Sequence, residues 1–107
     1  MNFNVVVSER AERNLEEIVN YLESEWSARI RDKYLLILKK KLKLISQKPL
    51  MYPASLKKKA VHRCVITKHS ILYYRIQDDR VEVITIQDAR RNPKKIKFEV
   101  LRSRNDE

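Results

Sequence analysis

The sequence predicts an α+β domain in which a helical hairpin packs on one face of an antiparallel β-sheet. Three consecutive β-prone runs, rich in Val, Ile, Tyr and Thr, lie in the second half of the chain. Two segments with the apolar spacing of amphipathic helices precede them. A half-buried sheet needs a cover on one face, and the helices can supply it. The expected element order is strand, helix, helix, strand, strand, strand.

The length and composition are those of one small globular domain. The chain has 107 residues, of which 43% are hydrophobic and 36% are charged. This balance is typical of a folded core with a highly charged surface. We therefore predict a single domain over residues 1–107, with a charged tail from about residue 94. The chain has no glycine, which excludes the Gly-rich loops that bind phosphates and dinucleotides.

The charge of the chain indicates an anionic partner. Twenty-four Lys and Arg against fourteen Asp and Glu give a net charge of +10. A positive field of this size suits nucleic acid, an acidic protein segment or a membrane surface, and the alternative is an inert solvated surface. Phe3–Val7 is too short for a signal peptide or a membrane span, and charges follow it at once. We expect a cytoplasmic protein with no membrane partner.

The first part of the chain predicts one strand and two helices. Phe3–Val7 is strongly β-prone. Ser8 can cap a first helix and Ser27 a second, Ala28–Gln47, which stops before Pro49. Each helix has an apolar stripe at steps of three and four. These stripes are Ala11, Leu15, Ile18, Leu22 and Trp26, and then Ile30, Tyr34, Leu35, Leu38, Leu42 and Ile45.

The rest of the chain predicts a loop and an antiparallel meander. The loop, Lys48–Ala60, has two prolines and three consecutive lysines. The expected strands are Val61–Thr67, Ile71–Ile76 and Arg80–Ile86, with Leu72, Tyr74 and Ile76 on one face of the second. Cys64 falls inside the first of these strands and is expected to be a small core residue. After Pro93 the tail could form one more short strand or helix.

Five pieces of the sequence occur in an order that matches a known family. They are VVVSERAERNLEEIVNYL, a KP turn after the second helix, an arginine early in the first meander strand, ILYYRI followed by DDRVEVITI, and a closing ARRNP. Together they resemble the ParE and RelE toxins of bacterial toxin–antitoxin pairs, over nearly residues 3 to 94. The resemblance implies the toxin of a type II pair, associated with plasmid stabilisation and neutralised by a cognate acidic antitoxin.

One activity implied by the resemblance is ribosome-dependent cleavage of messenger RNA. RelE-like members cut in the ribosomal A site, where the 2′-hydroxyl attacks the adjacent phosphate. This reaction needs a base, cations that hold the phosphorane charge, and a donor for the leaving oxygen. The residues that match the family's cations are Lys57, Lys58 and Lys59 in the loop, Arg63 on the sheet, and Arg90 or Arg91.

The sequence departs from the RelE pattern at the acid–base position. The family carries a tyrosine or histidine near the C-terminus, and Phe98 stands there instead. His62 and His69 remain possible acids or bases, although an exposed histidine near a strand end or a turn is more often without function. Asp88 occupies a position where many ParE-like sequences have histidine, which weakens any role carried over from it.

The other implied activity is inhibition of DNA gyrase by protein–protein contact. ParE-like members bind gyrase and trap its cleaved complex with DNA, which requires a shaped and charged surface but no acid–base set. The sequence favours this activity. The expected partner-binding residues are Lys57, Lys58, Lys59, Arg63, Arg90 and Arg91. Arg90 and Arg91 could instead form surface salt bridges with Asp88 or Glu99.

A third hypothesis is a basic nucleic-acid-binding module with neither activity. The sequence lacks the interleaved aromatic residues of single-strand binders and the spacing of a helix-turn-helix. Two histidines, one cysteine and scattered acids give no metal-ligand spacing, so we expect no metal and no cofactor.

Overall fold

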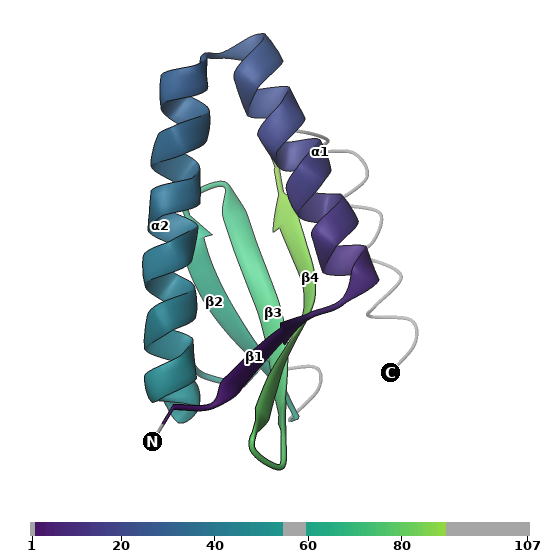
Figure 1. The fold of residues 1–107 in the computed structure, drawn as a ribbon, viewed down its shortest axis with the longest axis vertical. Helices are drawn as coiled ribbons and strands as arrows, with labels where there is room; N and C mark the ends of the chain where they lie inside the picture. Colours follow the sequence, from purple (N-terminus) through teal and green to yellow (C-terminus); the bar gives the residue numbers. More distant parts are fainter. Residues whose placement is uncertain (1, 55–59, 90–107) are drawn as a thin grey trace.

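The computed structural model describes residues 2–54 and 60–89 and has the predicted element order (Figure 1). The elements are β1 (Asn4–Val7), α1 (Glu9–Glu25), α2 (Ala28–Gln47), the 3-10 turn η1 (Pro49–Met51), β2 (Val61–Thr67), β3 (Ser70–Gln77) and β4 (Arg80–Asp88). The α+β class, with a helical hairpin packed on a sheet, is confirmed. The predicted structure in the tail after Pro93 lies outside the described residues.

The sheet has the strand order β1-β4-β3-β2. Strands β2, β3 and β4 form the predicted antiparallel meander. Strand β1 also joins the sheet as predicted, but it runs parallel to β4, with Asn4 opposite Arg80 and Val7 opposite Val83. The sheet is therefore mixed rather than wholly antiparallel. A short Val-rich strand suits either direction, and the path of the chain through the helices decides which one forms.

Both helices begin at the serines that the sequence indicates. The Ser8 hydroxyl accepts a hydrogen bond from the Ala11 amide at 3.0 Å, and it donates one to the Ile84 carbonyl at 2.8 Å. The Ser27 hydroxyl accepts from the Ile30 amide at 3.1 Å. Each hydroxyl pairs with an amide of the first helical turn, which has no partner within the helix. The Ser8 cap also fixes the start of α1 against β4.

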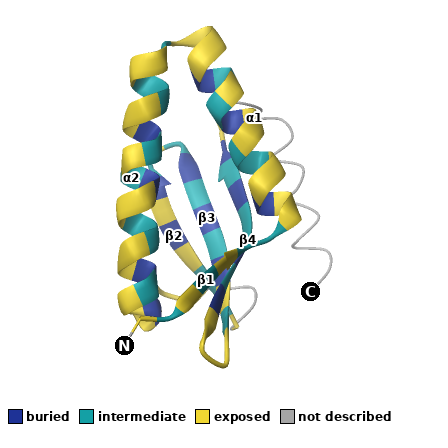
Figure 2. Cartoon of the chain, in the orientation of Figure 1, coloured by how far each residue is buried: buried dark blue, intermediate teal, exposed yellow. Residues whose placement is uncertain are grey.

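The core lies between the hairpin and the sheet (Figure 2). Inside the core, the hydroxyl of Tyr34 on α2 and the hydroxyl of Ser70 on β3 form a hydrogen bond of 2.6 Å. Trp26 was predicted to end the apolar stripe of the first helix, but it is 60% exposed. It is the C-cap residue of α1, and its backbone has left the helical path that keeps a stripe facing the core. The buried hydrophobic residues are Ala11, Ile18, Leu22, Tyr34, Leu38, Ile45, Cys64, Ile66, Leu72, Tyr74, Val81, Val83 and Ile86.

Helix α1 covers the edge of β4 where β1 ends. Pairing with β1 stops at Val83, and beyond it the ladder with β3 has an irregularity. There the Asn14 side-chain oxygen of α1 accepts from the Thr85 hydroxyl at 2.7 Å and from the Ile86 amide at 3.1 Å. A strand edge that would otherwise present an open amide is thus closed by a helix side chain.

The segment predicted as an irregular loop after α2 is ordered at its start. It contains η1, whose first residue Pro49 is buried and accepts a hydrogen bond from the Tyr74 hydroxyl. The Pro53 carbonyl accepts from the Arg63 amide at 3.1 Å, and Ala54 forms a bridge with His62. This segment therefore pairs with the first half of β2.

In the described ranges, no helix is long and apolar enough to cross a membrane.

The two-residue loop between β3 and β4 predicts a small stability difference. Asp78 has φ of 54°, a region that glycine enters without steric cost. We expect Asp78→Gly to raise the free energy of unfolding by about 0.5 kcal/mol, because relief of backbone strain exceeds the added chain entropy. Asp79→Gly removes the same charge at negative φ and should lower it by about 0.5–1 kcal/mol. Urea unfolding followed by circular dichroism measures both, and equal shifts would show that charge dominates.

Candidate functional site

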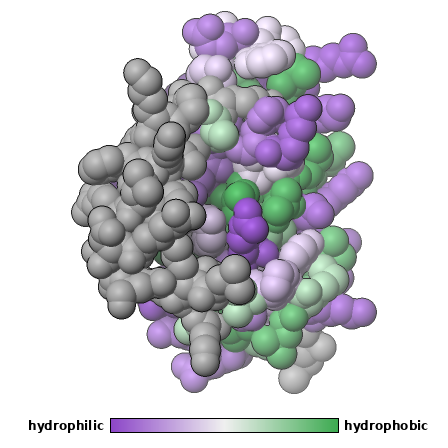
Figure 3. Space-filling model, turned by 180° about the vertical axis from the view of Figure 1, so that it is seen from behind, coloured by the Kyte–Doolittle hydropathy of each residue, from purple (hydrophilic) through white to green (hydrophobic). Residues whose placement is uncertain are grey.

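The face of the sheet opposite the helices carries an arginine–aromatic–aliphatic surface. Along β2 and β3 the buried residues face the helices, so the residues between them face the other way. The strand register places Arg63 opposite Tyr73 and Val65 opposite Ile71. Figure 3 shows this side of the molecule, where hydrophobic and strongly hydrophilic side chains lie next to one another. The surface is called the open face below and comprises Arg63, Val65, Ile71, Tyr73, Arg75 and Glu82.

The two described arginines of the open face differ in electrostatic environment. Arg75 forms a salt bridge with Glu82 at 3.1 Å, across a register pair of β3 and β4. Arg63 is exposed, and no carboxylate in the described ranges forms an ion pair with it. A partly neutralised arginine contributes less to the binding of an external anion than one without a counter-charge. Of the two, Arg63 is thus better able to bind an external anion.

The structure places one of the predicted site residues on this face. Arg63 lies on the exposed side of β2, and its role in a site stays a prediction. The other predicted site residues lie outside the described ranges, so their arrangement around Arg63 stays a prediction, as does any salt bridge of Arg90 or Arg91. These residues are Lys57, Lys58, Lys59, Arg90 and Arg91.

His62 is on the opposite face of β2 from Arg63, and His69 lies in the turn at the end of that strand. His62 lies on the helix side of β2, where its ring stacks on Tyr74 at 5.2 Å between centroids. Its Nδ1 atom is 2.9 Å from the Tyr52 carbonyl oxygen. His69 is in the turn between β2 and β3, and its carbonyl accepts from the Ala89 amide at 2.8 Å. His62 is therefore a packing residue that holds the segment after η1, and acid–base chemistry on the open face gains no support from it.

Sequence reasoning missed the other five members of the open face, which are Val65, Ile71, Tyr73, Arg75 and Glu82. A usable signal existed. Leu72, Tyr74 and Ile76 were assigned to one side of their strand by period-two spacing, so Ile71, Tyr73 and Arg75 had to face the other side. Which side is open depends on where the helices pack, and the strand pattern alone does not contain that information.

A second cluster of polar groups lies beneath α2, on the helix side of the sheet. Cys64 is fully buried, as predicted, and burial raises the pKa of its thiol. Burial and a hydrogen bond with Cys64 raise the pKa of Tyr52 to about 12, and burial also raises that of Tyr74. The Lys41 ammonium lies 5.9 Å from the centroid of the Tyr52 ring. A protonated, buried thiol is a poor nucleophile, so this cluster is structural.

Metal binding finds no support in the described ranges. No three His, Cys, Asp or Glu side chains there are grouped so that they could hold an ion. The described residues of the open face offer charge, hydrogen-bonding groups and apolar contact area.

The raised pKa of Tyr52 predicts a pH dependence of stability. The folded protein favours the neutral phenol, so this contribution is complete below pH 10, the ordinary pKa, and is lost as the pH rises towards about 12. We expect the free energy of unfolding to fall more steeply between these values in the native protein than in Tyr52→Phe. Urea unfolding at several pH values measures both proteins. The two proteins differ only at residue 52, so parallel curves would contradict the assignment.

Comparisons with known proteins find the same fold in bacterial toxins. The family model described as "ParE toxin of type II toxin-antitoxin system, parDE" matches residues 5–93. Among solved structures, a chromosomal ParDE system from P. aeruginosa aligns with TM-score 0.70 and 10% identity, over 80% of this chain and 95% of that chain. The RelBE2 complex from Mycobacterium tuberculosis gives TM-score 0.58 and 17% identity, over 82% and 99%. A mutant of E. coli RelE in the free state gives 0.58 and 18%, over 95% and 97%. No curated protein matches the chain.

Proposed function

Because the chain belongs to the ParE toxin family of type II toxin–antitoxin systems, we propose that it inhibits DNA gyrase by protein–protein contact. It acts in the cytoplasm, and a cognate acidic antitoxin neutralises it. The net charge of +10 supports an acidic partner of this kind. The open face is the proposed target-binding surface.

The observation that carries this proposal is the chemistry of the open face. It combines two exposed arginines, of which Arg75 is paired with Glu82, with a partly buried tyrosine and exposed or partly buried aliphatic residues, which is the composition of a protein-binding hot spot. His62 lies on the far side of the same strand. A binding surface needs no general base, so Arg63, Val65 and Tyr73 suffice for contact.

A second candidate, ribosome-dependent cleavage of messenger RNA, is favoured by one specific observation. Tyr73 lies directly opposite Arg63 in the strand register, so a tyrosine and an arginine occupy neighbouring positions on one face. Arginine stabilises a phosphorane charge, and a phenol can donate to a leaving oxygen. Tyr73 could thus replace the C-terminal tyrosine that the sequence lacks.

Two assays with purified components separate these functions. The first measures supercoiling and DNA cleavage by gyrase with added toxin, and the second measures messenger cleavage on programmed ribosomes. We expect inhibited supercoiling, accumulated cleaved DNA and intact messenger. Cuts at defined codon positions with unaffected gyrase would overturn the proposal and make Tyr73 the first residue to replace. Activity in neither assay, with affinity for bare nucleic acid that persists at physiological salt, would favour a nucleic-acid-binding module.

A further inference from the structure

Helix α2 carries basic and apolar side chains in a row on the side turned away from the sheet. The row is called the α2 stripe and consists of Arg29, Lys33, Leu36, Lys40 and Leu44. Steps of three and four residues place its members on one side of the helix, and all five are exposed. Leu36 is 54% exposed and Leu44 is 41% exposed. The buried α2 residues are Tyr34, Leu38 and Ile45, and their spacing places them on the opposite side of the helix. Figure 2 shows buried and exposed positions alternating along α2.

The positive charge of the hairpin is concentrated on α2. This helix has seven Lys and Arg and one Asp, whereas α1 has six Glu and two Arg. Arg31, which is outside the stripe, bonds Glu23 at 2.7 Å and Asp32 at 2.9 Å. No described carboxylate forms an ion pair with Arg29, Lys33 or Lys40. The cations of the stripe are therefore available to an acidic partner.

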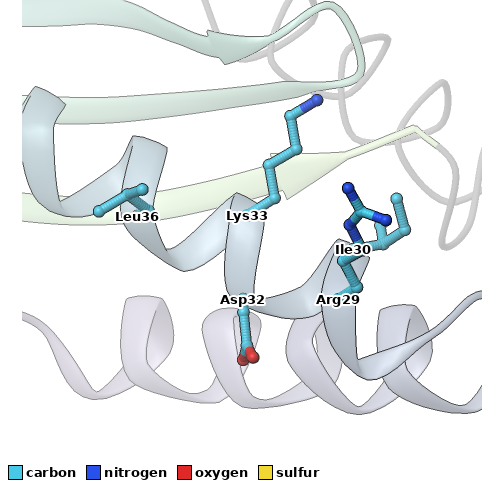
Figure 4. Close-up of a pocket in the computed structure, with 5 residues that line it drawn as sticks. All are labelled: Arg29, Ile30, Asp32, Lys33 and Leu36. Atoms are coloured by element: carbon cyan, nitrogen blue, oxygen red, sulfur yellow. The ribbon is translucent and has the colours of Figure 1, made fainter.

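The N-terminal half of the stripe borders an open depression of about 590 Å³. Its lining residues are Arg29, Ile30, Asp32, Lys33 and Leu36 (Figure 4). Asp32 points towards α1, away from the side chains of Arg29 and Lys33. The depression thus offers two apolar side chains flanked by two cations. This arrangement suits an apolar side chain whose neighbours along a helix are carboxylates.

We propose that the α2 stripe docks an acidic amphipathic helix of a protein partner. Leucine-like side chains of that helix contact Leu36, Leu44 and the depression, and its carboxylates face Lys33 and Lys40. The argument for this occupant is charge complementarity along a surface that also exposes leucine, since phosphate backbones would gain nothing from the leucines. The inference deepens the proposed function, because it names where the acidic partner attaches.

The stripe and the open face lie on different surfaces of the molecule. The stripe is on the side of α2 opposite its buried residues, and Arg63 is on the sheet face that the helices do not cover. A helix docked on α2 therefore leaves Arg63 accessible. The partner can hold the toxin through α2 while the target face stays open, and neutralisation requires a different segment of the partner to reach that face.

A synthetic acidic peptide tests the stripe directly. The probe is a fluorescent helical peptide of about five turns, with Leu at three- and four-residue steps and Glu beside them. We expect Leu36→Ser to raise its Kd at least about tenfold, and Lys33→Glu/Lys40→Glu to do the same. The control Lys68→Glu/Arg80→Glu makes the same charge change away from α2 and should change Kd less than about twofold. Amide NMR shifts should fall on α2 and spare Arg63 and Tyr73.

Three results would overturn the docking site. Equal losses in both double variants, with Leu36→Ser unchanged, would show general electrostatic attraction. Shifts centred on Arg63 would place the peptide on the open face. Self-association that the peptide cannot displace would show that a second copy occupies α2. The gyrase assay contains no peptide, so inhibition of gyrase without peptide binding would remove this inference and leave the proposed function standing.

Discussion

Arg63→Ala is expected to reduce inhibition of gyrase at least about thirtyfold without unfolding the protein. Arg63 is the exposed cation of the open face that forms no ion pair within the described ranges, and it adjoins Tyr73 across the strand pair. Central arginines of this kind often contribute about 2 kcal/mol or more to a protein interface. The side chain is exposed, so its loss should leave the core unchanged. A dose–response curve for supercoiling measures the effect.

The matched control for Arg63→Ala is Lys68→Ala. Lys68 is an exposed cation in the turn after β2, so the net charge changes equally while the open face keeps all its members. We expect its potency to stay within about twofold of the native protein. If Arg63→Ala kept full potency, or if both variants lost it equally, the open face would not be the target-binding surface. In the ribosome assay, Arg63→Ala tests the role of Arg63 in messenger cleavage.

Leu22→Ala is expected to cost about 2–5 kcal/mol of unfolding free energy, which is a large share of the stability of a domain this small. Leu22 is fully buried in the core between α1 and the sheet. Truncation removes apolar contacts and leaves a cavity that the packed neighbours fill only in part. We expect a large fall in the midpoint of urea unfolding, and loss of folded protein at physiological temperature if the native margin is low.

Leu36→Ala makes the same chemical change on the exposed side of α2. Leu36 is 54% exposed, so we expect its effect on unfolding to stay within about 0.5 kcal/mol. Circular dichroism during urea unfolding measures both variants under the same conditions. A comparable cost for the two leucines would contradict the burial pattern of the hairpin. If Leu36→Ala keeps its stability, it also serves to test the α2 stripe, because any loss of peptide binding would then come from the missing side chain and not from unfolding.

The candidate site shows where sequence reasoning stops. Arg63 could be placed on the sheet because its strand is short, β-prone and follows a proline-containing loop. Its neighbours Tyr73 and Arg75 needed the register and the identity of the covered face, which are long-range facts. His62 was a possible acid or base on sequence grounds, yet its stacking on Tyr74 makes it a packing residue. An alternating pattern says that two faces differ, but not which one the helices cover.

The sequence by itself determined the local structure, since that depends on neighbours within a few residues. Serine caps, apolar spacing and β-branched runs place the two helices and the strands, and they explain why the fold class could be predicted. Only the tertiary structure decided the direction of β1. It also decided which side of the sheet stays open. These features depend on which segments far apart in the chain contact one another, and side-chain periodicity carries no information about those contacts.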